Sequence, residues 1–329
     1  MFHQEIISIT EKILKVPDYS ISYEDACGLA ALPEKHTIDL IACADKIRNR
    51  FKKNHVFTCA ITNAKSGFCS QDCAFCAQSS HHETGIDTYP LLSRTELVNN
   101  ALRMHQAGAT KFSFVTSGYM LTDQEIDTIC QAAAIIQEKT DLLLCASLGM
   151  LTGPMAKKLK ASGIIRYHHN LETSRSYFSQ VCTTHEYDED VQSVKFAVSA
   201  GLQVCCGGIL GLGESWDQRM ELALTLKELN VDSTPLNFLN PIPGTKMADR
   251  PLLSPMEALK CIALFRFANP EKDIAICGGR EVTLGDFQSW VFMAGANGLM
   301  VGDYLTTKGR NIQMDLDMIQ EMGLINGSD

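Results

Sequence analysis

The chain has 329 residues, of which 45% are hydrophobic and 20% are charged, so it can bury one barrel-sized core or two ordinary ones. The formal net charge is −9 and no block of Lys and Arg stands out, which argues against nucleic acid or an anionic membrane surface and favours a small substrate. No apolar run reaches the roughly 20 residues that span a bilayer, and the N-terminus lacks a cleavage site, so we expect a cytoplasmic protein.

The first part of the chain, residues 1–55, is expected to be an N-terminal helical extension with helices at 4–15, 22–31 and 36–53. From residue 56, short β-rich runs alternate with helical patterns. The expected strands are 56–62, 111–116, 142–147, 165–170, 203–209, 234–239, 273–277 and 297–301. The expected helices between them include 94–107, 122–138, 187–200, 214–230, 254–268 and 283–294.

Strands that alternate with helices in this way favour a closed (β/α)8 TIM-type barrel over residues 56–302, with an open doubly wound sheet as the alternative. The tail, 303–329, is too short for another domain and is expected to close one end of the barrel as a lid. The three parts would form one functional unit. In such barrels the reactive residues lie at the C-terminal ends of the strands and in the loops that follow them.

Thirteen cysteines are many for a chain of this length. In a small secreted domain they would indicate disulfides, but this chain is long, shows no secretion signal and has an odd number of cysteines. We therefore expect metal ligands or reactive thiols.

The loop after the first expected strand contains Cys69, Cys73 and Cys76 in a C-x3-C-x2-C spacing. Three thiolates in one short loop can converge on a cuboidal 4Fe-4S cluster, and three ligands for four irons leave one iron open. A zinc site would need a fourth ligand, and His81 and His82 are close enough to keep that alternative open. A redox CxxC pair would leave Cys69 unexplained.

A C-x3-C-x-aromatic-C motif in the first loop of a barrel resembles the radical S-adenosylmethionine superfamily. The resemblance narrows to the biotin synthase family, and the matching segments are 63–80, 167–174, 207–215, 236–245, 278–281 and 292–310. It implies that the open iron binds S-adenosylmethionine and that an electron from the cluster releases a 5′-deoxyadenosyl radical. It further implies sulfur insertion into dethiobiotin, an auxiliary Fe-S cluster inside the barrel as the sulfur source, an electron donor such as flavodoxin or ferredoxin, a sulfur donor and a homodimer.

The resemblance assigns several residues to the cofactor. Phe75 would lie near the adenine of S-adenosylmethionine, and Thr116 and Ser117 belong to the segment that receives its amino group. Asn170 and Glu172 would lie between the ribose and the substrate, with Glu172 at a position where Asp is more typical. Carboxylates suit a ribose diol because their oxygens accept hydroxyl protons.

Other residues are assigned to the substrate by the same resemblance. Asn170 and Asn237 would contact dethiobiotin, the latter at its ureido ring, and Thr306 and Thr307 would receive its carboxylate. The alternative for both asparagines is that they satisfy buried backbone groups, which is the usual task of a buried amide.

The auxiliary cluster implied by the resemblance is a two-iron cluster on three cysteines and one arginine. The corresponding positions here are Ser113, Cys145, Cys205 and Ala275, so a serine and an alanine replace two of the four ligands. Cys206 follows Cys205 and is expected to face the helices instead, because successive strand residues point to opposite faces. The two-iron site therefore does not transfer directly.

Two further cysteines compensate for this loss. Cys59 lies on the first expected strand, and Cys277 lies on the seventh, two residues beyond Ala275 and hence on the same strand face. Odd-numbered strands share layers inside such a barrel, so inward side chains can meet at one level. We predict an auxiliary cluster of the four-iron type on Cys59, Cys145, Cys205 and Cys277, with Ser113 as a bystander or weak ligand. The alternative is that these four cysteines are small buried hydrophobic residues.

Two residues do not fit the resemblance. Cys182 has no explanation from the sequence, and Asp190 stands where an arginine for the cofactor's carboxylate is implied. Either the alignment is shifted across 175–190, or another cation such as Lys65 or Arg280 serves.

Two other functions remain open. One is a related radical S-adenosylmethionine barrel enzyme, hydrogenase-maturase-like or methylornithine-synthase-like. The other is a non-catalytic Fe-S carrier, against which the expected barrel, the open iron and the polar strand ends argue.

Overall fold

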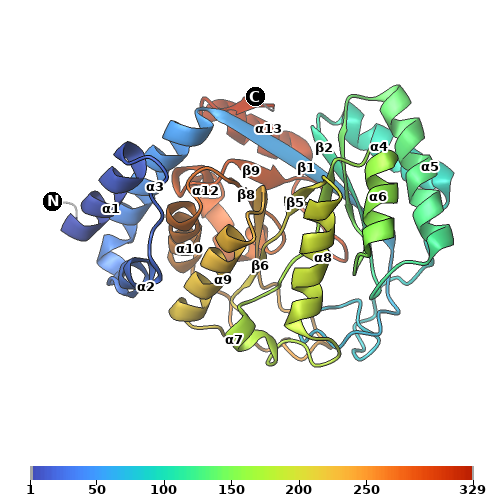
Figure 1. Cartoon of the computed structure of the whole chain (residues 1–329), viewed down its shortest axis with the longest axis horizontal. Coiled ribbons are helices and arrows are strands. Elements are labelled where there is room, and N and C mark those ends of the chain that lie inside the picture. Colours follow the sequence, from blue (N-terminus) through green and yellow to red (C-terminus); the bar gives the residue numbers. More distant parts are fainter. Residues whose placement is uncertain (1–2, 328–329) are drawn as a thin grey trace.

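A parallel sheet closes on itself in this computed structural model, which describes residues 3–327 (Figure 1). Closure occurs because β1 (His55–Lys65) pairs with β2 (Lys111–Thr116) on one side and with β9 (Gly298–Met300) on the other. The architecture is therefore the predicted (β/α)8 TIM-type barrel, and the open doubly wound alternative is wrong.

The remaining strands complete the barrel in chain order, and all of them pair in parallel. They are β3 (Leu143–Ser147), β4 (Arg166–His168), β5 (Gln203–Cys205), β6 (Gly208–Leu210), β7 (Ser233–Phe238) and β8 (Asp273–Ile276). The helices around them are α4 (Arg94–Gln106), α5 (Asp123–Lys139), α6 (Gly153–Ala161), α7 (Arg175–Phe178), α8 (Tyr187–Ser199), α9 (Trp216–Glu228) and α10 (Pro255–Ala268).

Hydroxyl side chains begin most of these outer helices. Each accepts a hydrogen bond from a backbone N–H in the first turn, which satisfies one of the donors that a helix start leaves free. The capping residues are Ser93 on α4, Thr122 on α5, Thr152 on α6, Ser215 on α9 and Ser254 on α10.

The fifth barrel position is not the continuous strand predicted over 203–209. It is interrupted between β5 and β6, and both pieces pair with β7. The neighbouring residue on β7 is Pro235, which has no N–H to donate to a ladder. The gap needs glycine, because a Cβ on Gly207 would lie 1.9 Å from the carbonyl oxygen of Pro235.

The helix predicted over 283–294 is also divided. The structure has α11 (Arg280–Leu284), a 3-10 turn η2 (Gly285–Phe287) and α12 (Trp290–Met293). Gly285 has a φ of 49°, which lies in the left-handed region and ends α11.

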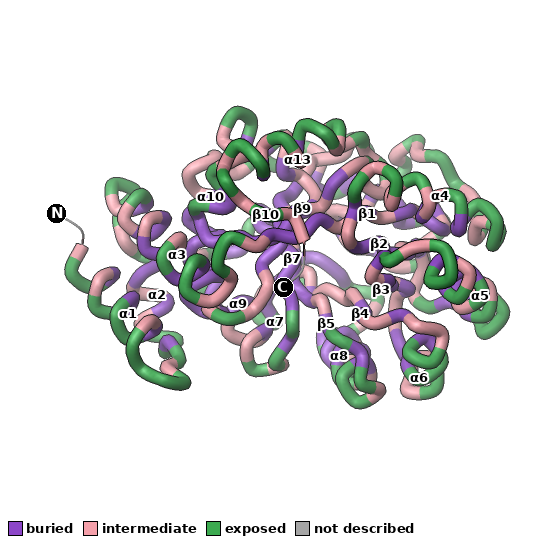
Figure 2. The backbone as a smooth tube through the Cα atoms, turned by 90° about the horizontal axis from the view of Figure 1, so that it is seen from above, coloured by how far each residue is buried: buried purple, intermediate pink, exposed green. Residues whose placement is uncertain are grey.

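The N-terminal helices cover one side of the barrel. They are α1 (Gln4–Lys15), α2 (Tyr23–Ala31), the 3-10 turn η1 (Glu34–His36) and α3 (Thr37–Lys52). In Figures 1 and 2 they lie beside α9 and α10, and α2 packs on α9 while α3 packs on α10. Figure 2 shows the buried segments gathered between these layers. Among residues 3–327, no helix has the length and apolar character needed to cross a membrane.

The C-terminal segment connects the two ends of the barrel. At the C-terminal end of β1, Asn63 Nδ2 donates to the carbonyl oxygen of Leu305 at 2.8 Å. The chain then forms α13 (Ile312–Glu321) and β10 (Ile325–Asn326), and β10 pairs with the first residues of β1. Neither of these elements is predicted from the sequence.

A buried ion pair fastens α13 to the barrel. The Arg280 guanidinium donates to both carboxylate oxygens of Asp315, at 3.1 and 2.8 Å, and both residues are fully buried. Such a two-point contact holds the helix in one orientation. It also occupies Arg280, which the sequence had offered as a cation for the cofactor.

We expect Asp315→Ala to lower the free energy of unfolding by about 3–5 kcal/mol, because the Arg280 charge would remain buried without its main partner. Denaturant unfolding of the two proteins measures this loss. Asp317→Ala is the control, since Asp317 lies two residues away on the exposed face of α13 and accepts a hydrogen bond from Gln313 Nε2. Equal stability of the two variants would contradict the expectation.

Candidate active site

A cavity of about 440 Å³ runs from the C-terminal ends of the strands down to the first residues of β2 and β4, Lys111 and Arg166. The residues assigned to the cofactor, the substrate and the two clusters all line it. From the strands these are Cys59, Ser113, Thr116, Cys145, Cys205 and Asn237, and from the segments after the strands Cys69, Cys73, Phe75, Cys76, Ser117, Asn170, Glu172, Cys277, Thr306 and Thr307. Their grouping in one cavity is what a single reaction centre requires.

The cysteine triad, Cys69, Cys73 and Cys76, occupies a loop with a defined backbone. Cys76 N–H donates to the carbonyl oxygen of Cys73 at 3.0 Å, and Cys69 N–H donates to that of Gln78 at 3.1 Å. Burial raises the pKa of Cys76 to about 11. The pKa of Cys73 is raised by the hydrogen bond between Cys73 and Cys182 and by burial. Thiols in such a setting ionise when a nearby positive charge compensates them, and iron would provide that charge. The triad therefore fits a cluster.

The two histidines after the triad do not face it. His82 Nδ1 lies 2.8 Å from the carbonyl oxygen of Cys76, and His81 Nε2 lies 3.1 Å from that of Ser70. Within residues 3–327, no three Cys, His, Asp or Glu side chains are grouped as ligands of a single metal ion. A cluster differs from a single ion because each thiolate binds a different iron. The geometry thus weighs against zinc.

Asp72, between the first two cysteines of the triad, holds a distant segment against the loop. It accepts hydrogen bonds from Thr183 N–H at 2.8 Å and Thr183 Oγ1 at 2.6 Å, and from the Cys182 thiol at 3.4 Å. Burial alone would raise the pKa of Asp72, but these hydrogen bonds hold it well below its usual range. This network explains Cys182, which the sequence left without a role, as a contact of the loop that carries Cys73.

Asp190 is paired with two histidines. His169 Nε2 lies 2.7 Å from one carboxylate oxygen and His185 Nε2 lies 3.2 Å from the other. Burial alone would lower the pKa of His185, but its hydrogen bonds with Asp190 and Cys182 raise it to about 10. A protonated His185 therefore lines the cavity next to Asp190, the residue that stands where the family resemblance implies an arginine.

The cations that the sequence suggested in its place are occupied elsewhere. Lys65 Nζ lies 2.7 Å from the carboxylate of Glu125, and Arg280 is bound to Asp315. His185 could not be recognised in advance, because its charge depends on a contact with Asp190 that only the folded chain provides.

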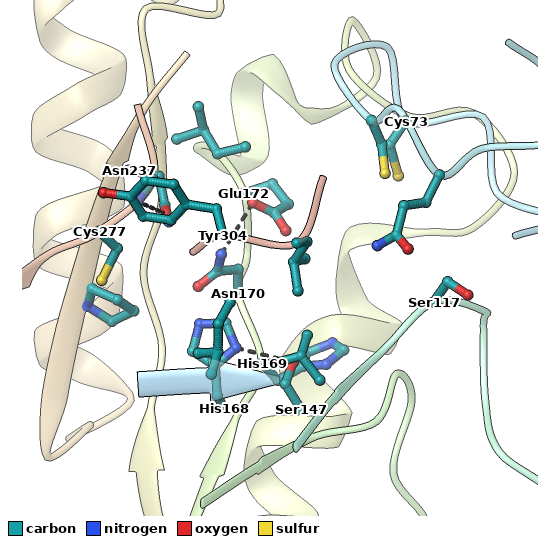
Figure 3. Close-up of a pocket in the computed structure, with 18 of the residues that line it drawn as sticks. Cys73, Ser117, Ser147, His168, His169, Asn170, Glu172, Asn237, Cys277 and Tyr304 are labelled. Carbon is teal, nitrogen blue, oxygen red and sulfur yellow. Dashed lines mark hydrogen bonds between the residues drawn. The ribbon is translucent and has the colours of Figure 1, made fainter. Parts of the chain in front are cut away.

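Asn170 and Glu172 follow β4 and contact each other. Asn170 Nδ2 donates to Glu172 Oε2 at 3.2 Å, and Asn170 Oδ1 accepts from Gly207 N–H at 3.2 Å (Figure 3). Burial, and then the charge of Asp190, raise the pKa of Glu172 to about 8. Glu172 also has a φ of 60°, uncommon for a residue with a side chain, which marks this turn as locally strained.

The last residue of β2, Thr116, has a hydroxyl without a hydrogen-bond partner in the described part of the chain. Thr116 Oγ1 is buried without a hydrogen-bond partner, although buried polar atoms normally have one. Ser117 Oγ instead donates to the carbonyl oxygen of Gly67 at 2.7 Å. Phe75 lines the cavity and also packs against a small apolar cluster that includes Leu212. The unpaired Thr116 fits a ligand that supplies a polar group.

Asn237, which the resemblance assigns to the substrate, lies across the cavity from Ser117 (Figure 3). Asn237 Oδ1 accepts from Gly278 N–H at 2.9 Å, and Asn237 Nδ2 donates to the carbonyl oxygen of Gly208 at 3.2 Å. Asn237 thus serves backbone groups as well as facing the cavity. Thr306 and Thr307 belong to a turn that lines the mouth.

The four deep cysteines, Cys59, Cys145, Cys205 and Cys277, lie close enough to affect one another. Burial raises the pKa of each, and the raised pKa of Cys59 also reflects Cys145 and Cys205, while that of Cys277 reflects Cys205 and Cys59. Four buried thiols of this kind fit a shared cationic centre.

Two neighbours of the deep cysteines take different positions. Ser113 is in register with Cys145 on the adjacent strand and also lines the cavity. Cys206 belongs to the main apolar core beneath the helices and does not line the cavity, which confirms its predicted direction.

A (β/α)8 barrel with a three-cysteine loop at the mouth is typical of radical S-adenosylmethionine enzymes. Residues 64–226 match the model of the Radical SAM superfamily, and residues 235–325 match that of the Biotin and Thiamin Synthesis associated domain.

Relatives narrow the assignment. The chain is 56% identical over 312 residues to a biotin synthase of Syntrophus aciditrophicus (strain SB), which covers 95% of this chain and 96% of the relative. It is 52% identical to a biotin synthase of Nitratidesulfovibrio vulgaris (strain DSM 19637 / Miyazaki F), and this match covers 94% of this chain and 88% of the relative. The chain belongs to the biotin synthase family.

Solved structures share the fold at low identity. A methylornithine synthase superposes with a TM-score of 0.83 at 19% identity over 97% of both chains. A maturase of the [FeFe]-hydrogenase also gives 0.83, at 18% identity over 98% of this chain and 75% of its own. These likenesses support the barrel alone.

We expect Asp72→Ala to lower the free energy of unfolding by about 2 kcal/mol, because the buried Cys182 thiol and the N–H and hydroxyl of Thr183 would lose their acceptor. The loop should also retain less iron after reconstitution, which metal analysis measures. Asp87→Ala is the matched control, since Asp87 is an exposed residue that follows the same loop. Full iron retention by Asp72→Ala would contradict the expectation.

Proposed function

We propose that the chain inserts sulfur into dethiobiotin to form biotin, by radical chemistry on S-adenosylmethionine. The observation that carries this proposal is that two separate groups of cysteines line one cavity. Figure 3 shows Cys73 on one side and Cys277 on the other, with Asn170 and Glu172 between them. A substrate held there would face a radical source on one side and a sulfur source on the other.

The cysteine triad would hold the 4Fe-4S cluster that binds S-adenosylmethionine. When bound, the 4Fe-4S cluster and S-adenosylmethionine together supply 5′-deoxyadenosyl radicals, which abstract one hydrogen from each of the two carbons that receive sulfur. Thr116, with its unpaired hydroxyl, Ser117 and Phe75 would position the cofactor. Asn170 and Glu172 would receive its ribose hydroxyls, for which a carboxylate or amide oxygen is a suitable acceptor.

Dethiobiotin would occupy the space beside Asn237. The amide of Asn237 suits a ureido group because it both donates and accepts hydrogen bonds. Thr306 and Thr307 would receive the substrate's carboxylate at the mouth, and the walls of the cavity would keep water and stray hydrogen donors away from the radical. The electron donor, the sulfur donor, the homodimer and the cytoplasmic location stay predictions from the sequence.

The four deep cysteines would hold the auxiliary cluster that gives up sulfur. Four thiolates are the ligand set of a four-iron cluster, which favours this type over a two-iron one. Ala275, at the position where the family resemblance implies an arginine ligand, also lines the cavity but cannot bind iron. Ser113 would be at most a weak ligand.

We expect substitutions in the two groups of cysteines to remove different activities. After anaerobic reconstitution with iron and sulfide, Cys73→Ala should lose both 5′-deoxyadenosine and biotin formation. Cys145→Ala should still cleave S-adenosylmethionine but form no biotin. Product analysis by mass spectrometry measures both. Cys130→Ala, on α5 and outside the cavity, is the control and should keep both activities. Biotin formation by Cys145→Ala would contradict the assignment.

The type of the auxiliary cluster has its own test. In the protein with Cys69, Cys73 and Cys76 replaced by Ala, Mössbauer spectra should show a four-iron centre, because the four deep cysteines remain. Further replacement of Cys277 by Ala should reduce the iron and sulfide content. A residual two-iron centre would contradict the four-iron proposal.

A further inference from the structure

Two cations form the floor of the cavity. Lys111 begins β2 and Arg166 begins β4, and both line the cavity below the four deep cysteines. In the sheet, Lys111 is in register with Cys59 and Arg166 is in register with Cys145. We call these two residues the floor cations. The function proposed above gives them no role.

The floor cations are buried more deeply than such side chains usually are. Lys111 is 5% exposed and Arg166 is 8% exposed, whereas Lys and Arg are rarely buried unless they are paired. Lys111 Nζ lies 3.5 Å from the centre of the Phe57 ring, a cation–π contact. Arg166 donates from Nε and Nη2 to the side-chain oxygen of Gln203, at 3.2 and 3.0 Å. Neither contact supplies a negative charge.

The carboxylate of Asp273 faces the floor cations, and it is shared. Arg166 Nη2 lies 3.9 Å from Asp273 Oδ2, while Lys52 Nζ lies nearer, at 3.0 Å from Asp273 Oδ1. Asn297 Nδ2 also donates to Oδ1, at 2.9 Å. One carboxylate thus serves Arg166 and Lys52 directly and Lys111 at longer range. The floor has an excess of positive charge in a place where charge is costly to bury.

The excess positive charge of the floor cations acts on the thiols of the deep cysteines. Burial raises the pKa of Cys59, Cys145 and Cys205, and the charges of Lys111 and Arg166 oppose that rise in all three. An iron–sulfur cluster on four thiolates carries net negative charge and becomes more negative on reduction. Positive charge next to it stabilises both the thiolates and the reduced form.

We propose that Lys111 and Arg166 are electrostatic positioning residues for the auxiliary cluster, which compensate its negative charge and raise its reduction potential. The inference rests on the proposed function, because it needs a cluster on the four deep cysteines. The floor cations do not ligate iron. They act from the strands adjacent to β1 and β3, where Lys111 and Arg166 are in register with Cys59 and Cys145.

Redox titration of the auxiliary cluster tests this proposal. The full-length chain with the cysteine triad replaced by Ala isolates the auxiliary signal, which electron paramagnetic resonance or absorption can follow. Lys111→Met and Arg166→Met should each shift its potential to more negative values, and the double variant should shift it further. Lys111→Arg and Arg166→Lys should stay near the parent value, because they keep the charge.

The opposite change provides a second test that keeps both floor cations in the chain. Asp273→Asn removes the competing carboxylate and should shift the potential to more positive values, even if a methionine variant fails to fold. In the chain with both clusters, the potential of the cluster on the triad should change less in every variant. A role confined to barrel packing would not produce shifts of opposite sign.

The outcomes separate the two proposals. An auxiliary cluster whose potential is the same in Lys111→Met, Arg166→Met and Asp273→Asn would overturn the role of the floor cations and leave the proposed function standing. If no auxiliary cluster formed even in the parent protein, the proposed function would fail and the inference with it.

Discussion

The burial of many thiols in one cavity is the constraint on which the site depends. A thiolate in a poorly solvated space is unfavourable unless positive charge lies close to it, so empty cysteines of this kind remain protonated. In the proposed function iron would supply that charge at both ends of the cavity, and the protein adds His185 at the mouth and the floor cations at the base. Three cationic side chains of the chain therefore line the same cavity as the thiols.

The barrel makes this arrangement possible because parallel register places residues from distant parts of the chain at defined heights. Cys59 and Cys145 are separated by a long stretch of sequence, yet each has a buried cation beside it in the ladder. The mouth is less regular, and there hydrogen bonds from side chains, rather than strand pairing, hold the segments together. Asn170 and Asn237 bind backbone groups around the gap between β5 and β6, and Asp72 joins the triad's loop to the segment after α7. The same cavity thus has a rigid base and a mouth built from side-chain hydrogen bonds.

Much of this could be predicted from the sequence, because alternating strands and helices and the spacing of the cysteine triad are local signals. The barrel and its closure followed from them. The break after Cys205 could not be predicted, because it depends on Pro235 in the neighbouring strand. The helix α13 was missed because its main anchor, Asp315, becomes buried only through Arg280.

The site shows the same division. The residues assigned to the cofactor, the substrate and the clusters all line one cavity. Strand alternation accounts for the inward direction of the deep cysteines, and the loop after β1 carries the cysteine triad. The contacts of Asp72 with Cys182 and Thr183 could not be predicted, because more than a hundred residues separate Asp72 from these partners. His185 and Asp190 are close in the sequence, but only the fold buries their contact. The surplus charge of Lys111 and Arg166 was hidden for another reason. A lysine or arginine at the start of a strand is usually solvated, and only the closed barrel removes these two from water.

The course of the C-terminal segment has a practical consequence. β10 adds to the base of β1, while the preceding turn with Leu305 is tied to the top of the same strand, so residues 305–326 bridge both ends of β1. Removing the pairing of Ile325 and Asn326 with β1 would therefore free one of the two anchors of the turn that lines the cavity entrance.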